Sequence, residues 1–268
     1  MILKKGVLTV QVIAYFIISL LASIAGAICG IGGGVIIKPS LDLFHLDSVA
    51  TISFLSGCTV LAMSCYSVTK SMRAGESKID LKIGTPLAIG AAIGGVAGKQ
   101  MFSVISASMQ ETAGAVQALC LFLITLATML YTLFKARIHT RKIFNLWVCL
   151  AIGLALGIMS SFLGIGGGPI NLVVFYFFFS MDTKTAAQNS LYVILISQIT
   201  SLASTLITGS VPPFSWLSLI LMVAGGIGGG MLGRVFNKKM DNKAVDKLFL
   251  CLMVIIMGIS LYNVFQYS

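Results

Sequence analysis

Long apolar runs joined by short connections dominate this chain and limit what it can fold into. A helix needs roughly 20 apolar residues to cross the hydrocarbon core of a bilayer. Eight segments approach that length, at about residues 7–29, 49–69, 83–105, 112–134, 144–162, 187–208, 214–236 and 246–265. Only 10% of the 268 residues are charged, whereas a soluble domain carries roughly 25%. The pattern predicts an all-α, polytopic helical membrane protein that lies in a lipid bilayer.

The chain is also duplicated. Residues 30–34 (Gly-Ile-Gly-Gly-Gly) return as residues 164–168, an offset of 134 positions (164 − 30). A second set of glycines spaced four apart is repeated at nearly the same offset, as Gly90, Gly94, Gly98 and Gly225, Gly229, Gly233. Small residues at this spacing are typical of faces on which helices pack closely. We expect a first transmembrane repeat, a cytoplasmic linker and a second transmembrane repeat, at residues 1–134, 135–143 and 144–268.

The basic residues indicate how the two repeats are oriented. The segment 70–82 holds four of them and its counterpart 209–213 holds none, whereas 99–111 holds one and its counterpart 234–247 holds five. Basic residues mark cytoplasmic loops, so equivalent loops face opposite sides of the membrane. This is the pattern of inverted-topology repeats. Short basic clusters between apolar runs also differ from the basic face of a nucleic-acid-binding protein, so we expect no nucleic-acid partner.

Inversion requires an odd number of crossings in each half. An odd number results if each half contains a helical hairpin that enters the membrane and returns. Such a hairpin would consist of the glycine-rich break and the short apolar stretch that follows it, at 35–44 or 169–180. Both chain termini would then be external. Consecutive glycines disfavour a continuous helix by about 1 kcal/mol each, and unwound backbone persists in a bilayer only where protein or water satisfies it. The alternative role for these glycines is close helix packing.

The breaks favour a binding site for an anion. Short helices that begin near Val35 and Pro169 would present free N–H groups and the positive ends of two helix dipoles. Lys38 could complement a bound anion, because a lysine at membrane depth is usually functional; the alternative is that it reaches back to the interface. Hydroxyl and amide side chains after each break could add donors, or could serve helix–helix hydrogen bonds. The candidate substrate-binding residues are Gly32, Gly33, Gly34, Lys38, Thr51, Ser53, Gly166, Gly167, Gly168, Asn171, Gln188, Asn189 and Ser190.

Other chemistries have no residues to support them. The two histidines, His45 and His139, lie in loops, so the chain lacks a zinc-protease motif. The acidic residues lie in loops or at segment ends, which leaves no buried carboxylate pair for catalysis. We therefore expect no enzymatic activity, no metal site and no cofactor. An inventory rich in donors and free of buried acids suits a small oxyanion better than a cation.

Two pairs of segments resemble a known family. Residues 28–39 (Ile-Cys-Gly-Ile-Gly-Gly-Gly-Val-Ile-Ile-Lys-Pro) and 162–169 (Phe-Leu-Gly-Ile-Gly-Gly-Gly-Pro) are similar to the paired glycine-rich motifs of the sulfite exporter TauE/SafE family. Residues 50–53 and 186–191 resemble the small-polar stretch that follows each motif. The likeness covers essentially the whole chain. It implies a multi-pass transporter in the plasma membrane for sulfite, sulfonates or other small organosulfur anions.

We therefore expect a secondary transporter of a small anion that works by alternating access around a site between the halves. A passive anion channel would share this architecture and is the first alternative. A non-transport membrane protein, such as an intramembrane enzyme or an assembly factor, is the second. The absence of a catalytic constellation disfavours it.

Overall fold

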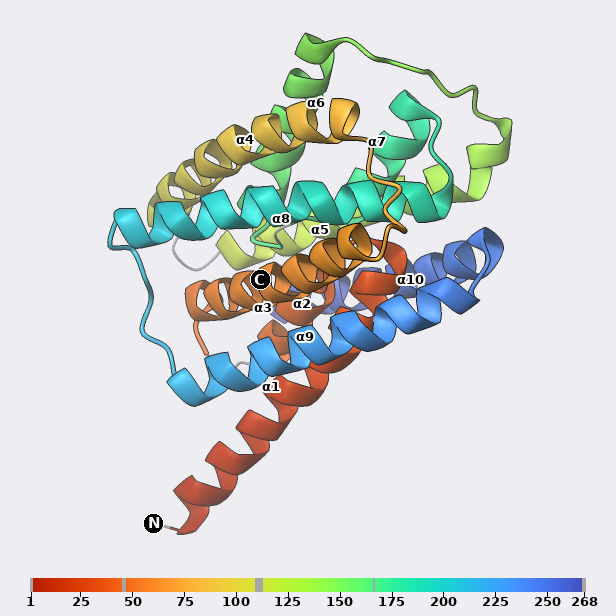
Figure 1. Ribbon diagram of the computed structural model, residues 1–268. Helices are drawn as coiled ribbons and strands as arrows, with labels where there is room; N and C mark the ends of the chain where they lie inside the picture. Colours follow the sequence, from red (N-terminus) through yellow and green to blue (C-terminus); the bar gives the residue numbers. More distant parts are fainter. Residues whose placement is uncertain (1, 45–46, 109–112, 166, 267–268) are drawn as a thin grey trace.

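The computed structural model describes residues 2–44, 47–108, 113–165 and 167–266 (Figure 1). Every regular element in these residues is a helix. In chain order they are α1 (Ile2–Cys29), α2 (Gly34–Leu43), α3 (Val49–Arg73), α4 (Leu81–Ser108), α5 (Ala113–Phe134), the 3-10 helix η1 (Lys135–Arg137), α6 (Leu146–Phe162), α7 (Pro169–Phe179), α8 (Thr183–Ile207), α9 (Trp216–Lys239) and α10 (Asn242–Gln266). Seven of them are long and apolar enough to cross a membrane. The prediction of an all-helical, multi-pass membrane protein is confirmed.

The helices α2, α6 and α7 are shorter than the rest. One of the eight expected spans, α6, is not among these seven. It has 17 residues and a length of about 25 Å, slightly less than the roughly 30 Å hydrocarbon core. The chain leaves the helical conformation between α1 and α2 and again between α6 and α7. Gly30 and Gly32 have φ angles of +76° and +71°, and Gly164 has +66°, values that L-residues with a side chain rarely adopt. The glycine motifs therefore interrupt the helices at both expected places.

The two breaks meet at the centre of the molecule. A Cβ atom built on Gly34 in the first break would lie 2.3 Å from the carbonyl oxygen of Ile165 in the second. Such an atom on Gly32 or on Gly167 would meet the same side chain, Ile194 of α8. Val60 of α3, the counterpart of Ile194 (194 − 60 = 134), contacts the first break in the same way. The breaks of the two halves thus pack together around one buried apolar residue from each half.

The repeated glycine stripes join the two halves. A Cβ atom on Gly90, Gly94 or Gly98 of α4 would lie 2.1 to 2.4 Å from backbone oxygens of α6. The second stripe brings α9 equally close to the backbone of α1, where Gly229 and Gly233 would each clash at 2.6 Å. No side chain fits at such distances, so only glycine permits these contacts. Each half therefore packs its fourth helix against the first helix of the other half.

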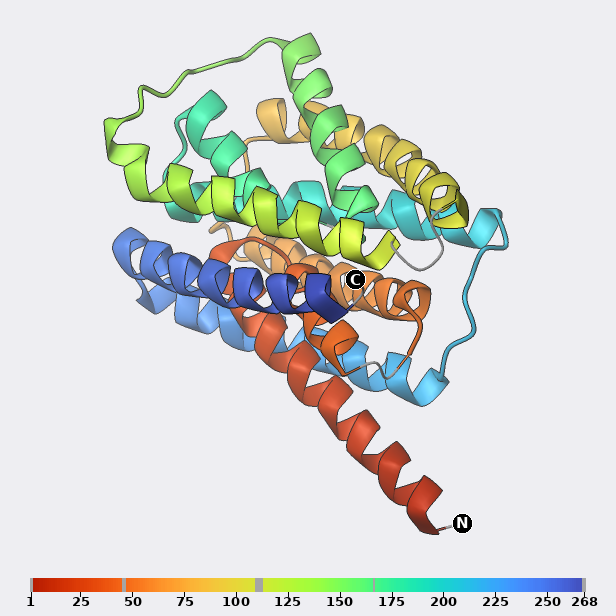
Figure 2. The same cartoon turned by 180° about the vertical axis from the view of Figure 1, so that it is seen from behind.

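Equivalent helices of the two halves run in opposite directions. Near the end of α3, Ser71 contacts Gln188 near the start of α8, whereas Gly57 near the start of α3 lies beside Gln198 further along α8. The helices α3 and α8 are therefore antiparallel. On the far side of the molecule α5 and α10 also lie side by side (Figure 2). This geometry supports the inverted-repeat interpretation.

Two ends of the bundle can be distinguished. The α3–α4 and α8–α9 connections lie at opposite ends (Figure 1). Glu76 in the α3–α4 connection binds Arg234 and Lys238 at the end of α9, so these segments share one end. That end holds most of the basic loop residues, and we call it the cytoplasmic end on the basis of the positive-inside rule. The opposite, external end includes the α8–α9 connection.

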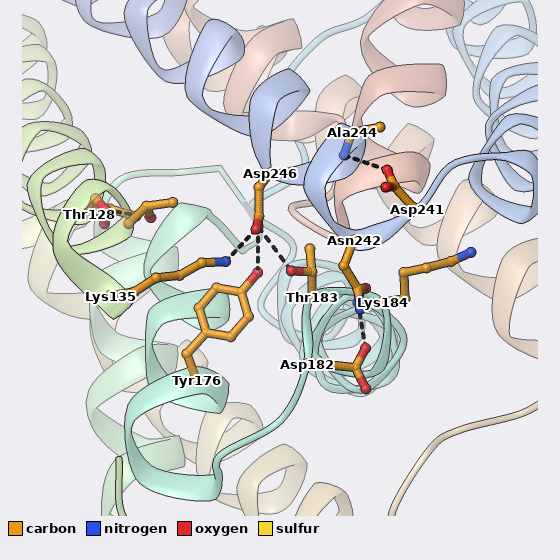
Figure 3. Close-up of polar contacts among 11 residues, drawn as sticks. Thr128, Lys135, Tyr176, Asp182, Thr183, Lys184, Asp241, Asn242, Ala244 and Asp246 are labelled. Carbon is orange, nitrogen blue, oxygen red and sulfur yellow. Dashed lines mark hydrogen bonds and ion pairs between the residues drawn. The ribbon is translucent and has the colours of Figure 1, made fainter. Parts of the chain in front are cut away.

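A polar cluster at the cytoplasmic end joins four helices (Figure 3). The carboxylate of Asp246 at the start of α10 accepts hydrogen bonds from Lys135 at 2.6 Å, from Thr183 at 2.9 Å and from Tyr176 at 3.4 Å. The Lys135 ammonium also lies 4.5 Å from the centre of the Tyr176 ring, a cation–π distance. These contacts fix the second helical hairpin against α5 and α10.

Labelling of introduced cysteines can test this topology. We expect Ser77→Cys and Ser210→Cys, each placed in a chain whose six native cysteines are replaced, to react with a membrane-impermeant maleimide from opposite sides. Both positions are exposed, and they lie in the α3–α4 and α8–α9 connections. Reaction of both thiols from the same side would contradict the inverted arrangement.

Candidate anion-binding cavity

A cavity of about 670 Å³ lies between α3, α4 and α8, next to the start of α5 and the end of α6. It begins at Gly164 in the second break and extends to Ser210 and Pro212 in the α8–α9 connection. Because Ser210 is exposed, the cavity opens toward the external end. Its volume falls within the range of roughly 300–1,000 Å³ that is usual for small-molecule sites.

More than half of the described residues that line this cavity carry a hydroxyl or an amide group, although apolar atoms form most of its surface. The helix α8 contributes a row of hydroxyls spaced three or four residues apart, which places them on one face: Ser197, Ser201, Thr205 and Thr208. Gln100, Gln117 and Gln198 add amide groups from α4, α5 and α8. Among the described residues that line the cavity, Lys99 carries the only charge and none is acidic. The lining therefore offers hydrogen-bond donors around one positive charge.

Lys99 lies near the end of α4 and is partly buried. Its ammonium donates a hydrogen bond to the hydroxyl of Thr205 on α8. No carboxylate of the described residues lies within ion-pair distance of Lys99. A partly desolvated ammonium without a counter-charge favours a negatively charged ligand, so this position can hold an anion electrostatically.

Of the residues predicted from the sequence, one lines this cavity and a second lies near its opening. Ser53 of α3 lines it next to Gly164. The hydroxyl of Thr51 donates to the carbonyl oxygen of Pro213 at 3.0 Å, which ties the start of α3 to the α8–α9 connection. These contacts place Thr51 close to the external opening.

Lys38 lies behind the cavity wall. Its side chain is buried, and its ammonium donates to Oε1 of Gln117 at 2.5 Å and to the carbonyl oxygen of Leu163 at 3.0 Å. Leu163 is the C-cap residue of α6, directly after its last residue. The lysine charge therefore complements the negative end of that helix. Gln117 lines the cavity and lies between the cavity and Lys38. The lysine therefore supports the cavity wall from behind.

Lys38→Met should lower stability more than it lowers anion binding. The change leaves two buried oxygen atoms, on Gln117 and Leu163, without their donor, and an unpaired buried polar group costs about 1–3 kcal/mol. We expect a lower melting temperature in detergent, with an anion affinity within about threefold of the wild type for protein that remains folded. A large loss of affinity at unchanged melting temperature would instead identify Lys38 as a direct ligand.

The glycines of the breaks pack at the centre and do not line the cavity, apart from Gly164. Asn171 lies nearby in α7 and is buried, and its side-chain oxygen has no hydrogen-bond partner. Gly166 lies outside the described residues. The remaining predicted positions at the centre are packed against Val60, Ile165, Ile194 or Ser23: Gly32, Gly33, Gly34, Gly167 and Gly168.

Three predicted residues lie instead near the cytoplasmic end. Oε1 of Gln188 accepts hydrogen bonds from the backbone N–H of Lys78 at 2.8 Å and from Ser71 at 3.3 Å. Asn189 accepts from the N–H of Asp80 at 2.9 Å and donates to the carbonyl oxygen of Lys78 at 3.0 Å. Ser190 is buried beside them, and its hydroxyl has no partner. These side chains attach the α3–α4 connection to α8.

The cytoplasmic end is closed by this attachment together with the ion pairs of Glu76. The carboxylate of Glu76 lies 2.7 Å from Arg234 and 2.8 Å from Lys238. The hydrogen bonds from Lys238 and Arg234 hold the pKa of Glu76 below its usual range, so Glu76 is ionised at neutral pH. Beneath these contacts lies a buried apolar cluster, Ala27, Met63, Val68 and Leu191. We call the ion pairs, the amide contacts and this cluster the cytoplasmic closure.

Sequence reasoning missed the cavity residues Lys99 and the hydroxyl row of α8. The spacing of the row was visible in the sequence, because Ser197, Ser201 and Thr205 recur every four residues. Lys99 falls within the expected connection 99–111, whereas α4 continues past it to Ser108. The described residues contain no group of three or more histidine, cysteine, aspartate or glutamate side chains that could hold a metal ion.

Comparisons with known proteins agree with this architecture. The family model described as sulfite exporter TauE/SafE matches residues 15–261. A curated relative, the "Probable membrane transporter protein YunE" of Bacillus subtilis (strain 168), is 25% identical over 263 residues, which cover 90% of this chain and 93% of the relative. No solved structure matches the chain. The family match spans nearly the whole chain, and the protein therefore belongs to the sulfite exporter TauE/SafE family of membrane transporters.

Proposed function

We propose that this transporter moves a small anion across the plasma membrane by alternating access, and that the anion is sulfite, a sulfonate or another small organosulfur compound. The observation that supports this most directly is the external cavity, which surrounds one lysine with hydroxyl and amide groups and contains no carboxylate among its described lining residues. The family description supports the choice of sulfur oxyanions.

The chemistry of the cavity matches that ligand class. A sulfite or sulfonate group carries three oxygen atoms that accept hydrogen bonds, and such bonds are strongest when one partner is charged. Lys99 supplies a charge and Ser201 supplies a hydroxyl from the facing helix, where Thr205 accepts the hydrogen bond that positions the ammonium. A metal cation would instead require carboxylate or carbonyl oxygens. In this proposal Ser53 adds a further donor from α3, and Lys38 fixes the amide of Gln117.

Alternating access is supported by a comparison of equivalent positions in the two halves. Four residues that line the open cavity are Gly57, Ser161, Ser197 and Leu202. Their counterparts at the 134-residue offset (191 − 57) are Leu191, Ala27, Met63 and Val68, which together form the buried cluster of the cytoplasmic closure. One end of the pseudo-symmetric molecule is thus open where the equivalent positions at the other end are packed shut. Exchange of the two states would expose a central site to each side in turn.

Binding and flux measurements test this proposal. The purified protein should bind sulfite, or a short sulfonate, in preference to sulfate and thiosulfate in an equilibrium screen. Proteoliposomes that contain it should accumulate the preferred anion with saturable kinetics and without unitary electrical currents. Large single-channel currents would instead indicate a passive anion channel. Competition by divalent cations, with none by anions, would overturn the choice of an anionic substrate.

A further inference from the structure

The cytoplasmic closure holds a cation at the position that matches Lys99 of the external cavity. Gly98-Lys99 of α4 and Gly233-Arg234 of α9 stand 135 positions apart (234 − 99), at the end of the two glycine stripes. The side chain of Arg234 is only 15% exposed. Each half therefore presents one cation from the same turn of the equivalent helix, one in the open cavity and one in the closed end.

Serine residues of α3 lie along the path of α9 toward Arg234. A Cβ atom on Gly226 would contact Thr59, and one on Gly230 would contact Ser67, so α9 and α3 run side by side in the same direction. One further turn advances both helices, α3 and α9, by about 5.4 Å. That turn brings Arg234 level with the segment that begins at Ser67 and continues to Ser71.

These serines are the counterparts of the hydroxyls in the external cavity. Ser67 and Ser71 correspond to Ser201 and Thr205 at the 134-residue offset (201 − 67). Thr205 is the residue that accepts the hydrogen bond from the ammonium of Lys99. The closed end therefore contains the same elements as the open cavity, a cation on the fourth helix of one half and hydroxyls on the facing helix.

The donors at the closed end are only partly used. Nη2 of Arg234 donates to Glu76 at 2.7 Å, whereas its Nη1 is buried and has no hydrogen-bond partner. The hydroxyl of Ser67 is buried and unpaired as well, whereas that of Ser71 donates to Gln188 at 3.3 Å. A guanidinium can donate to two oxygen atoms of one anion at once. The counterpart of Glu76 at the open, external end is Ser210 (210 − 76 = 134). The external cavity therefore has a hydroxyl, and no carboxylate, at the corresponding place.

We propose that Arg234, Ser67 and Ser71 form a second binding site for a small oxyanion, reached from the cytoplasm, and that the carboxylate of Glu76 occupies part of it in this conformation. The ligand class is that of the external cavity, so this inference rests on the proposed function. Glu76 then acts as an intramolecular competitor. An anion at Arg234 displaces the Glu76 carboxylate and opens the closure, and the return of the carboxylate releases the anion into the cytoplasm.

A reporter thiol in each half tests this site. Val68 and Leu202 are equivalent positions (202 − 68 = 134), and Leu202 lines the external cavity whereas Val68 is buried in the closure. Val68→Cys and Leu202→Cys are each introduced into the chain without native cysteines and labelled in membranes with an impermeant maleimide, with methanesulfonate or ethanesulfonate as the probe, since these sulfonates do not react with the maleimide. Glu76→Gln should speed labelling of the Val68→Cys thiol from the cytoplasmic side by about fivefold or more, the result of a modest population shift.

The probe anion should protect the Val68→Cys thiol in the Glu76→Gln protein. Arg234→Gln, added to that protein, should abolish the protection, and Arg234→Lys should retain most of it. Lys238→Gln is the matched control, because Lys238 is half-exposed and lies outside the proposed site; it should leave protection intact. The second site is overturned if the Val68→Cys thiol is still protected after Arg234→Gln. It is also overturned if Glu76→Gln does not speed labelling of that thiol while the Leu202→Cys thiol still labels. Failure of both probes to protect either thiol overturns the proposed function as well, so the two failures are distinguishable.

Discussion

Lys99→Gln should reduce anion binding by roughly 10- to 100-fold, because a hydrogen bond to a charged group contributes about 1.5–3 kcal/mol and each 1.4 kcal/mol changes affinity about tenfold. Lys99 is the only charged residue among the described residues that line the external cavity, so no neighbouring side chain can replace it. Uptake into proteoliposomes should fall in parallel. Equilibrium binding of sulfite or methanesulfonate to the purified protein measures the first effect directly.

Lys99→Arg is the matched control for this experiment. It keeps the positive charge and adds donors, and we expect binding within about tenfold of the wild type. The melting temperature should change little in either variant, since Lys99 has no carboxylate partner among the described residues and faces a cavity rather than packed atoms. Wild-type affinity in Lys99→Gln would show that the cavity does not bind the anion through this residue.

The second large effect is expected at the first glycine break. A Cβ atom on Gly30 would lie 2.3 Å from the Cα atom of Ala187 in α8, where backbone cannot move aside, and the φ angle of +76° disfavours any side chain. Gly30→Ala should therefore cost about 3–5 kcal/mol of folding stability, from left-handed strain and overpacking together. The thermal midpoint of the detergent-solubilised protein is the measurement.

Gly75→Ala separates these two causes. Gly75 has a similar φ angle of +67°, but nothing lies within 4 Å of the place where its Cβ would stand. This variant should therefore show the strain alone, about 1–2 kcal/mol. Equal losses in Gly30→Ala and Gly75→Ala would mean that the contact between the first break and α8 does not contribute to stability.

The architecture was largely readable from the sequence because it depends on local patterns. Apolar runs of membrane-spanning length became helices, and the consecutive glycines at 30–34 and 164–168 became breaks. The four-residue glycine spacing anticipated close helix contacts, although it did not reveal which helices would meet. Hydropathy and glycine spacing act within one helix, so a single sequence displays them.

The candidate site was less readable because it depends on contacts between the halves. Gln188 and Asn189 follow the second break in the sequence, yet their side chains bind the α3–α4 connection of the other half. The sequence leaves open whether Lys38 lies at membrane depth or reaches the interface; the structure buries it, and its partners Gln117 and Leu163 lie 79 and 125 positions away. Lys99 becomes a site residue only because α8 of the other half places Thr205 next to it.

The glycine stripes also have a consequence for how the protein is made. α1 leaves the ribosome first, yet the backbone on which it packs belongs to α9, which is synthesised nearly 200 residues later. Similarly, α4 finds its close partner α6 only in the second half. Until then the glycine faces of α4 contact lipid, which cannot follow their shape as closely as a helix backbone does. Neither half can complete its packing alone, so assembly in the bilayer must finish after synthesis of both halves, and a chain truncated before α9 leaves α1 without its main packing partner.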